Sequence, residues 1–307
     1  MPGSTIESRD KLAKVINELA VDGTELMVYR DVPNEIPYSQ YTVGVHLNYW
    51  PMWMDLQANK AKVLNKFFPT TKSFKEYYNG ASNYEEWINF IKNNIYAGLK
   101  EQPEYMVWHI AEATMEEVFT FEFTYSDLDI VKAAAAVFNQ VSANIPSNVL
   151  ILFENLWWPG LRLTDKIVVQ EFFSRLNYKN VGIMLDTGHL LNTNPNITTQ
   201  AEGIEYICNV LEKLGDAKRL IKGLHLNCSL SGQYIRSFER KYDRTCRGRK
   251  LYKHISNIDQ HQPFTDPRVS KIIELLDPKY VVHELMYQDF NELMDKVYKQ
   301  MTAIRGI

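Results

Sequence analysis

The stretch NVGIMLDTGHLLNT, from Asn180 to Thr193, begins as an apolar run of strand length and then breaks into an aspartate and a histidine three residues apart. A simple turn would explain Asp186 and Gly188, because both residue types are common where a strand stops. The other strands of the chain decide between a turn and a functional site, because the same kind of ending recurs in them. The stretch predicts a strand over 181–186 whose carboxyl end carries Asp186 and His189, with Gly188 letting the backbone turn between them.

Apolar runs of strand length alternate with helical patterns along the whole chain. Seven strands are predicted, over 24–30, 42–48, 104–110, 149–155, 181–186, 221–227 and 280–285. Apolar residues at helical spacing predict helices over 8–20, 83–99, 127–143, 164–176, 199–214, 267–276 and 290–303. Continuous apolar strands separated by helices are typical of a parallel sheet that is covered on both faces.

This alternation fits either an open doubly wound sheet or an eight-stranded barrel. Neither a G-x-G-x-x-G turn after the first strand nor a G-x-x-x-x-G-K phosphate loop occurs, which disfavours the open nucleotide-binding sheet. We therefore expect an α/β fold, a (β/α)8 TIM barrel in a single domain over 1–307, with long insertions after the strands of His46 and His225. The eighth strand is expected in MPGSTI at the N-terminus, where it would be short or clipped.

Composition limits the partners and the compartment. A net charge of −3 gives the chain no long-range attraction to nucleic acid or acidic membranes, although a local basic patch stays possible. No apolar run approaches about 18 residues and the start lacks a signal-peptide core, so no membrane segment is expected. The three cysteines, Cys208, Cys228 and Cys246, are odd in number and not in C-x-x-C spacing, which is typical of reduced thiols in a cytoplasmic protein.

Six of the predicted strands end in ionisable groups. These groups are His46, His109, Glu154, Asp186 with His189, His225 and Glu284. A single histidine or glutamate at a strand end is often an ordinary core residue, but in a parallel barrel all these ends share one mouth. Three carboxylates there, with no Arg or Lys at any strand end, would repel one another. A divalent metal such as Zn or Mn, with oxygen and imidazole ligands, would neutralise them.

The pair Asp259 and His261 forms a D-x-H motif in the segment that leads to the last strand. In an extended segment the two side chains lie on the same side. By itself the motif is a weak signal, but the segment could fold back over the mouth of the barrel. We therefore add both residues to the candidate metal ligands.

The motifs FEN, LDTGH, HLN, D-x-H and the final glutamate, in this order, resemble the xylose-isomerase-like barrel superfamily. Within it they resemble the apurinic endonuclease branch of endonuclease IV (AP endonuclease family 2). The resemblance implies three divalent metals in one cluster, with Glu154 as the bridging ligand. The implied ligands are His46, His109, Glu154, Asp186, His189, His225, Asp259, His261 and Glu284.

Sugar isomerases and epimerases of the superfamily imply a different site. There a single metal would be held by Glu154, Asp186, His225 and Glu284, and the catalytic residues Glu154 and Glu284 would move a proton between carbons. The chain also departs from the endonuclease pattern, because Cys228 replaces the aspartate of H-L-N-D and no DNA-probing loop is recognisable. Nucleic acid is thus disfavoured as a substrate, without being ruled out.

We expect a metal-dependent hydrolase of a phosphoester, with a small or nucleotide-like substrate and one to three metals per chain. A sugar or sugar-phosphate isomerase or epimerase is the alternative, and a barrel that binds a ligand without turnover is the third reading. Trp157 and Trp158 after the fourth strand could stack on a sugar or base, or simply pack. The insert over 232–254 has eight positive charges, and Arg236 and Arg244 in it could grasp phosphate or be solvated.

Overall fold

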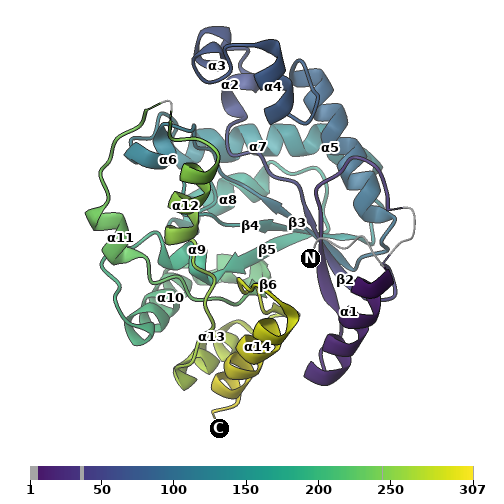
Figure 1. Cartoon of the computed structure of the whole chain (residues 1–307), viewed down its shortest axis with the longest axis vertical. Helices are drawn as coiled ribbons and strands as arrows, with labels where there is room; N and C mark the ends of the chain where they lie inside the picture. Colours follow the sequence, from purple (N-terminus) through teal and green to yellow (C-terminus); the bar gives the residue numbers. More distant parts are fainter. Residues whose placement is uncertain (1–5, 35–37, 244, 307) are drawn as a thin grey trace.

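The computed structural model describes residues 6–34, 38–243 and 245–306. Seven parallel strands form one sheet in sequence order and curl into a nearly closed barrel, which confirms the predicted α/β barrel (Figure 1). The strands are β1 (Thr24–Val28), β2 (Thr42–Leu47), β3 (Tyr105–His109), β4 (Leu150–Glu154), β5 (Val181–Asp186), β6 (Ile221–His225) and β7 (Tyr280–Val282). The eighth strand was expected on MPGSTI, of which residues 1–5 lie outside the described residues, and Ile6 begins the first helix.

Helices and long segments alternate with the strands, as the sequence predicts. The longer helices are α1 (Ile6–Leu19), α5 (Tyr84–Leu99), α7 (Asp127–Val141), α8 (Lys166–Ser174), α10 (Gln200–Leu214), α12 (Arg249–Ile258) and α14 (Phe290–Arg305). The shorter ones are α2 (Met54–Gln57), α3 (Ala61–Phe67), α4 (Thr71–Tyr77), α6 (Glu117–Thr120), α9 (Thr187–Leu191), α11 (Gly232–Ser237) and α13 (Ser270–Leu276). Three 3-10 turns are η1 (Ser142–Asn144), η2 (Gly215–Leu220) and η3 (Pro267–Val269). None of the described helices is both long and apolar enough to cross a membrane.

Side-chain caps fix where several helices begin. Ser126 before α7 and Thr199 before α10 each accept a hydrogen bond from the third backbone N–H of the helix, and the residue there bonds back. The side chains of Asn83 and Asp289 cap α5 and α14, because each accepts a hydrogen bond from a backbone N–H of the first turn. These caps satisfy backbone donors that would otherwise lack a partner, so the helices start at defined residues.

The two insertions that the sequence predicts are both present. The segment between β2 and β3 forms α2 to α5, and Figure 1 shows α2, α3 and α4 together at the top of the view. The segment between β6 and β7 includes α11 and α12, which lie at the left of the view beside α6 and α9. This second insertion carries the basic stretch 232–254.

The barrel interior is filled by a small apolar cluster below the mouth. Its buried members are Tyr105, Val107, Leu152, Met184 and Tyr280. Because side chains alternate along a strand, the residues two positions further on point to the same interior. His109, Glu154 and Asp186 occupy those positions, so the same alternation that builds the core brings ionisable groups to the open end.

The barrel has a seam, which we define as the gap between β1 and β7. Among the described strands these two do not pair with each other, while every other neighbouring pair does. Helices α1 and α14 lie against each other outside it. A cavity of about 420 Å³ lies at the seam, and its lining combines apolar residues such as Leu12, Val15, Leu293 and Val297 with the polar side chains of Glu25, His283 and Glu284.

Candidate metal centre

The nine predicted ligands come together at the carboxyl end of the barrel. His109, Glu154, Asp186 and His225 are the last residues of β3 to β6, and His46 is the last but one of β2. Donor atoms approach within 4.8 Å of one another in three groups, which are His46, His109, Glu154; Asp186, His189, His261; and Glu154, Asp186, His225, Glu284. Asp259 contacts two residues of the second group. The groups overlap, so they form one continuous centre.

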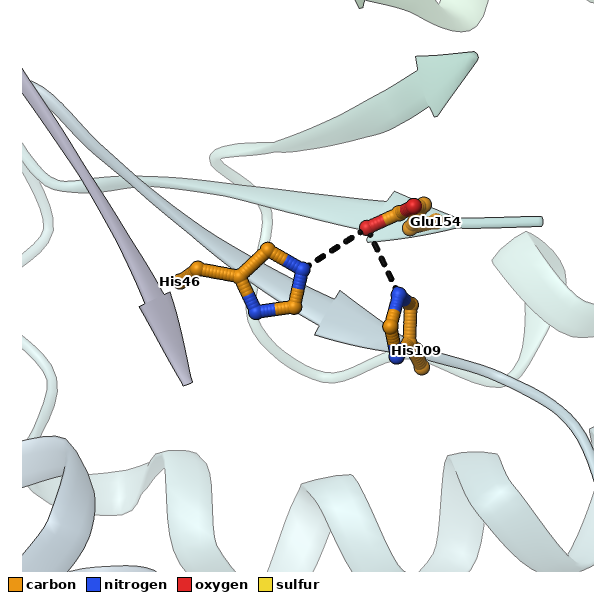
Figure 2. A group of neighbouring side chains, drawn as sticks. All are labelled: His46, His109 and Glu154. Atoms are coloured by element: carbon orange, nitrogen blue, oxygen red, sulfur yellow. Dashed lines mark hydrogen bonds and ion pairs between the residues drawn. The ribbon is translucent and has the colours of Figure 1, made fainter. Parts of the chain in front are cut away.

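Glu154 lies in the middle of this centre. Its Oε2 is 3.0 Å from Nε2 of His46 and 2.9 Å from Nε2 of His109 (Figure 2). Its Oε1 is 3.2 Å from Nδ1 of His189 and 3.3 Å from Nδ1 of His225. Burial alone would raise the pKa of Glu154, but the imidazoles of His109 and His225 outweigh it and hold the pKa well below its usual value. The carboxylate is thus charged and shared between two halves of the centre.

Asp259 and His261 form the part of the centre that contacts His189. Oδ1 of Asp259 is 2.9 Å from Nε2 of His261, and Oδ2 is 3.4 Å from Nε2 of His189. Burial opposes the charge of Asp259, but His261 and His189 overcome it and lower the pKa of the carboxyl. The same ion pairing outweighs burial and raises the pKa of His261 to about 10. The D-x-H motif therefore does fold back over the mouth.

Asp186 is oriented by amides that flank it. Asn227 donates from Nδ2 to Oδ2 of Asp186 at 2.6 Å, and Asn155 binds the backbone of Asp186 through both its amide oxygen and its amide nitrogen. The other oxygen, Oδ1, accepts from the backbone N–H of His189 and so caps α9. Burial raises the pKa of Asp186 to about 7, against the opposing charge of His189. These amides are the asparagines of FEN and HLN, to which the sequence assigned no role.

Three histidines are anchored through Nδ1 on backbone carbonyl oxygens. Nδ1 of His46 lies 3.0 Å from the carbonyl oxygen of Leu47. The corresponding distances are 2.9 Å from Nδ1 of His189 to the carbonyl oxygen of Asn155, and 3.1 Å from Nδ1 of His261 to that of Glu284. A carbonyl oxygen only accepts, so Nδ1 carries the proton in each ring. In a neutral ring Nε2 then offers a lone pair, and it faces a carboxylate oxygen in all three. Metal-binding histidines are usually held in this way.

Several buried polar atoms of the centre have no hydrogen-bond partner in the described part of the chain. They are both ring nitrogens of His109, Oε1 of Glu154, Nδ1 of His225, Oδ1 of Asp259, Nε2 of His261 and Oε2 of Glu284. Some of these atoms lie close together, for example Nδ1 of His225 and Oε2 of Glu284 at 2.9 Å, without hydrogen-bond alignment. Atoms that approach but do not point at each other fit a common third partner, so the donor set suits a divalent cation.

The loop that carries Asp259 and His261 is fixed by the segment that follows β6. Cys228 and Gln262 exchange two backbone hydrogen bonds, and Oγ of Ser229 accepts from the backbone N–H groups of Gln260 and His261. The prediction of an extended D-x-H segment is wrong, because His261 has φ +45° in the left-handed region. The two side chains meet because the chain turns there.

The predicted role of Gly188 is also wrong. The residue lies inside α9 and its φ is not positive, so no turn requires a glycine there. A Cβ at this position would lie 1.9 Å from Oδ1 of Asn227 and 2.8 Å from Oγ of Ser229. Glycine is needed because Asn227 packs on its Cα while it orients Asp186.

One residue of the centre was missed by the sequence analysis. Glu25 on β1 places Oε2 3.0 Å from Nε2 of His225 and accepts a hydrogen bond of 2.9 Å from the hydroxyl of Tyr105. Its side chain is 7% exposed. A glutamate inside the strand run TELMV was the available signal, because it occupies an inward position of a buried strand.

The four predicted substrate contacts are placed differently from the nine ligands. Trp157 and Trp158 are buried in a second apolar cluster, with the ring centre of Trp157 5.3 Å from that of His189. Both rings are almost fully covered by protein, so little of their surface is open to a substrate. Stacking of a substrate on them stays a prediction. Arg236 lies exposed on α11, where its guanidinium donates to the carbonyl oxygen of Pro195. Arg244 lies outside the described residues.

No protein-family model and no curated protein matches this chain. Solved structures do. Endonuclease IV from Thermus thermophilus is 12% identical, with a TM-score of 0.52, over 97% of this chain and 96% of that chain. A D-tagatose 3-epimerase-like protein is 12% identical with a TM-score of 0.46, over 98% of this chain and 85% of that one. A sugar phosphate isomerase/epimerase from Parabacteroides distasonis is 13% identical with a TM-score of 0.45, over 97% and 88%.

The chain shares its overall barrel fold with endonuclease IV from Thermus thermophilus. At this level of identity the likeness concerns the backbone and not the reaction. The reaction has to be argued from the residues at the mouth of the barrel.

Proposed function

We propose that the protein is a metal-dependent hydrolase of a phosphoester, with a cluster of divalent metals at the barrel mouth. The observation that carries the proposal is the far group of Asp259, His261 and His189, which adds donors beyond the set around Glu154. A single ion cannot use all nine residues, because four to six ligands complete its coordination. The donor set therefore fits two or three ions, with Zn or Mn as the metals that accept both nitrogen and oxygen.

The residues divide naturally between such ions. His46 and His109 would hold one beside Oε2 of Glu154, while His225 and Glu284 would hold a second beside Oε1 and Asp186. Asp259, His261 and His189 would hold a third. Ions bound in this way act as Lewis acids that neutralise charge on a phosphoryl group and on its leaving oxygen.

The chain itself orients the candidate ligands and keeps Glu154 away from water. Glu154 is fully buried among four imidazoles, and its Oε2 is hydrogen bonded to Nε2 of His46, which restricts its rotation away from the centre. Asn155 and Asn227 fix Asp186, and the backbone carbonyls fix three imidazoles. Groups that are oriented before the substrate arrives need no reorganisation during the reaction.

A sugar or sugar-phosphate isomerase or epimerase is the second candidate. It is favoured by the four-residue group of Glu154, Asp186, His225 and Glu284, whose donor atoms lie within 4.8 Å of one another and would hold one ion. In that reaction Glu154 and Glu284 would carry the proton between two carbons. The D-x-H residues would then have no ligand role, and this difference separates the two candidates.

Metal content per chain tests the choice, measured by mass spectrometry on protein purified without chelators or nickel resin. We expect about three Zn or Mn per chain, and about one fewer in Asp259→Asn. The matched control is Asp266→Asn, because Asp266 is paired with Arg268 at the start of η3 and should not affect metal content. One metal per chain, retained in Asp259→Asn but lost in Glu154→Gln, would move the assignment to the isomerase. A metal-free protein, even after metal is added back, would contradict both.

Activity is measured as release of p-nitrophenol from p-nitrophenyl phosphate and bis(p-nitrophenyl) phosphate. We expect Glu154→Gln to lower the rate by at least about 100-fold, because removing charge at the centre disrupts several contacts together. Hydrolysis that persists in Glu154→Gln at the wild-type rate would contradict the proposed site.

A further inference from the structure

An open groove lies directly beside Asp259. It measures about 440 Å³ and is lined by Tyr252, Ser256, Asp259, Gln260, Gln262 and Met286. Tyr252 is 66% exposed and Met286 is 46% exposed, so both offer apolar surface to a ligand in the groove. The groove therefore joins two uncovered apolar surfaces to the edge of the candidate metal centre.

Helix α12 presents one face to this groove. Residues three or four positions apart are neighbours on the surface of a helix. Arg249, Tyr252, Lys253 and Ser256 have this spacing, so they form one stripe along α12. The opposite face packs inward, with His254 and Ile258 buried. The stripe runs along the helix to Asp259, which ends it. The exposed tyrosine is thus held on a regular element and aligned with the metal centre.

The same stripe carries positive charge. Arg249 and Lys253 are both exposed, and in the described part of the chain neither forms an ion pair. They flank Tyr252 at i−3 and i+1. Cations beside an exposed ring, next to a site for phosphoryl groups, fit a ligand that combines an aromatic ring with phosphate.

We propose that this groove binds the base of a nucleotide whose phosphate reaches the metal centre. The inference rests on the proposed phosphoester hydrolase. Tyr252 stacks on the base, the thioether side chain of Met286 forms the other wall, and Arg249 and Lys253 contact additional phosphate groups. Gln260 and Gln262 donate their amide N–H groups to backbone oxygens, which leaves their amide oxygens in the groove to accept from the base edge.

The size and chemistry of the groove favour a base over a sugar alone. Cavities that hold small ligands measure about 300–1,000 Å³, and this one lies within that range. A sugar phosphate presents Tyr252 with a puckered ring of C–H groups and lacks the flat aromatic face of a base. A nucleobase offers such a face whatever its identity, so stacking alone does not select one base.

Binding to the metal-loaded protein tests the inference by titration calorimetry with three probes: AMP, ribose 5-phosphate and inorganic phosphate. We expect AMP to bind about tenfold tighter than ribose 5-phosphate, which is the range of one stacking contact. Tyr252→Ala should remove that difference, and Tyr252→Phe should keep most of it. The matched control is Tyr298→Ala, because Tyr298 is 69% exposed on α14 and lies outside the groove lining.

Equal binding of AMP and ribose 5-phosphate by the wild-type protein would overturn the inference, and so would a preference that survives Tyr252→Ala. Either result is compatible with hydrolysis of p-nitrophenyl phosphate, so the proposed function would stand without the groove. A preference for AMP that depends on Tyr252, in a protein that hydrolyses no phosphoester, would support the groove and contradict the hydrolase.

Discussion

At the scale of single residues, the candidate centre depends on groups that would not bind a metal themselves. Asn227 is the clearest case, because its amide orients Asp186 and its side chain needs the bare Cα of Gly188 to do so. Outer contacts of this kind set the direction of a ligand's lone pairs, and their loss typically costs about 10–100-fold in metal affinity.

Gly188→Ala should therefore weaken metal binding without removing any donor. The added Cβ would lie 1.9 Å from Oδ1 of Asn227, so the amide must move and Asp186 loses its hydrogen bond. We expect about 10-fold or more loss of metal affinity, measured by competition with a coloured chelator. The control is Gly203→Ala in α10, where the nearest atom is the end of the Leu191 side chain at 2.9 Å. Equal affinity in Gly188→Ala and the wild-type protein would contradict this account of Asn227.

At the scale of elements, one buried histidine of α12, His254, contributes polar contacts that hold the helix against the rest of the molecule. Nε2 of His254 donates to the carbonyl oxygen of Val118 at 2.9 Å, and Nδ1 accepts from the hydroxyl of Tyr234 at 2.8 Å. The ring also stacks on Phe119, with ring centres 4.3 Å apart. This arrangement needs a neutral imidazole, and burial lowers the pKa of His254 from its usual 6.5.

The contribution of His254 to stability should consequently fall in acid. Below about pH 6.5 the unfolded chain takes up a proton that the folded chain does not, so acidification favours unfolding. We expect the advantage of wild type over His254→Gln, in the free energy of unfolding by urea, to be full at pH 7 and smaller at pH 5. Tyr234 contacts the ring through the hydrogen bond between its hydroxyl and Nδ1. An advantage that is constant or grows on acidification would contradict the neutral ring.

At the scale of the whole molecule, Gln300 connects the last helix to the open end of the barrel. Its amide is fully buried and donates to the carbonyl oxygen of Leu226 and to Nδ1 of His283, while its oxygen accepts from the backbone N–H of Phe264. Burial lowers the pKa of His283 to about 4, so this ring is a neutral acceptor. One side chain on α14 thus ties together the ends of β6 and β7 and the loop after the D-x-H motif.

Gln300→Leu should destabilise the fold by about 3 kcal/mol, because two buried backbone groups and the half-buried ring of His283 lose their partner, and each buried loss costs about 1–3 kcal/mol. The measurement is urea unfolding followed by circular dichroism. Gln140→Leu is the matched control, since Gln140 is exposed on α7 and its loss should change stability by less than about 0.5 kcal/mol. Equal destabilisation by the two substitutions would show that Gln300 does not hold these segments.

The barrel and most of its mouth could be predicted from the sequence because both follow from local periodicity. Apolar runs locate the strands, and a parallel barrel brings their ends to one face, which is why His109, Glu154 and His225 could be grouped without coordinates. The turn at His261 and the packing of Asn227 on Gly188 depend on distances across the chain and leave no periodic signal. Glu25 was read as part of an ordinary strand because its partners, Tyr105 and His225, are 80 and 200 residues away.

The seam changes how this protein can evolve. Glu25 lies on β1 and Glu284 lies two residues after the end of β7, and both approach the ring of His225, at 3.0 Å and 2.9 Å. Where backbone hydrogen bonds do not close the barrel among the described strands, side chains of the candidate centre do so. In many enzymes the active site is a local weakness, and replacing its polar groups strengthens the fold. Here a substitution of His225 that removes it from the candidate centre would also remove the side-chain contacts that Glu25 and Glu284 make across the seam.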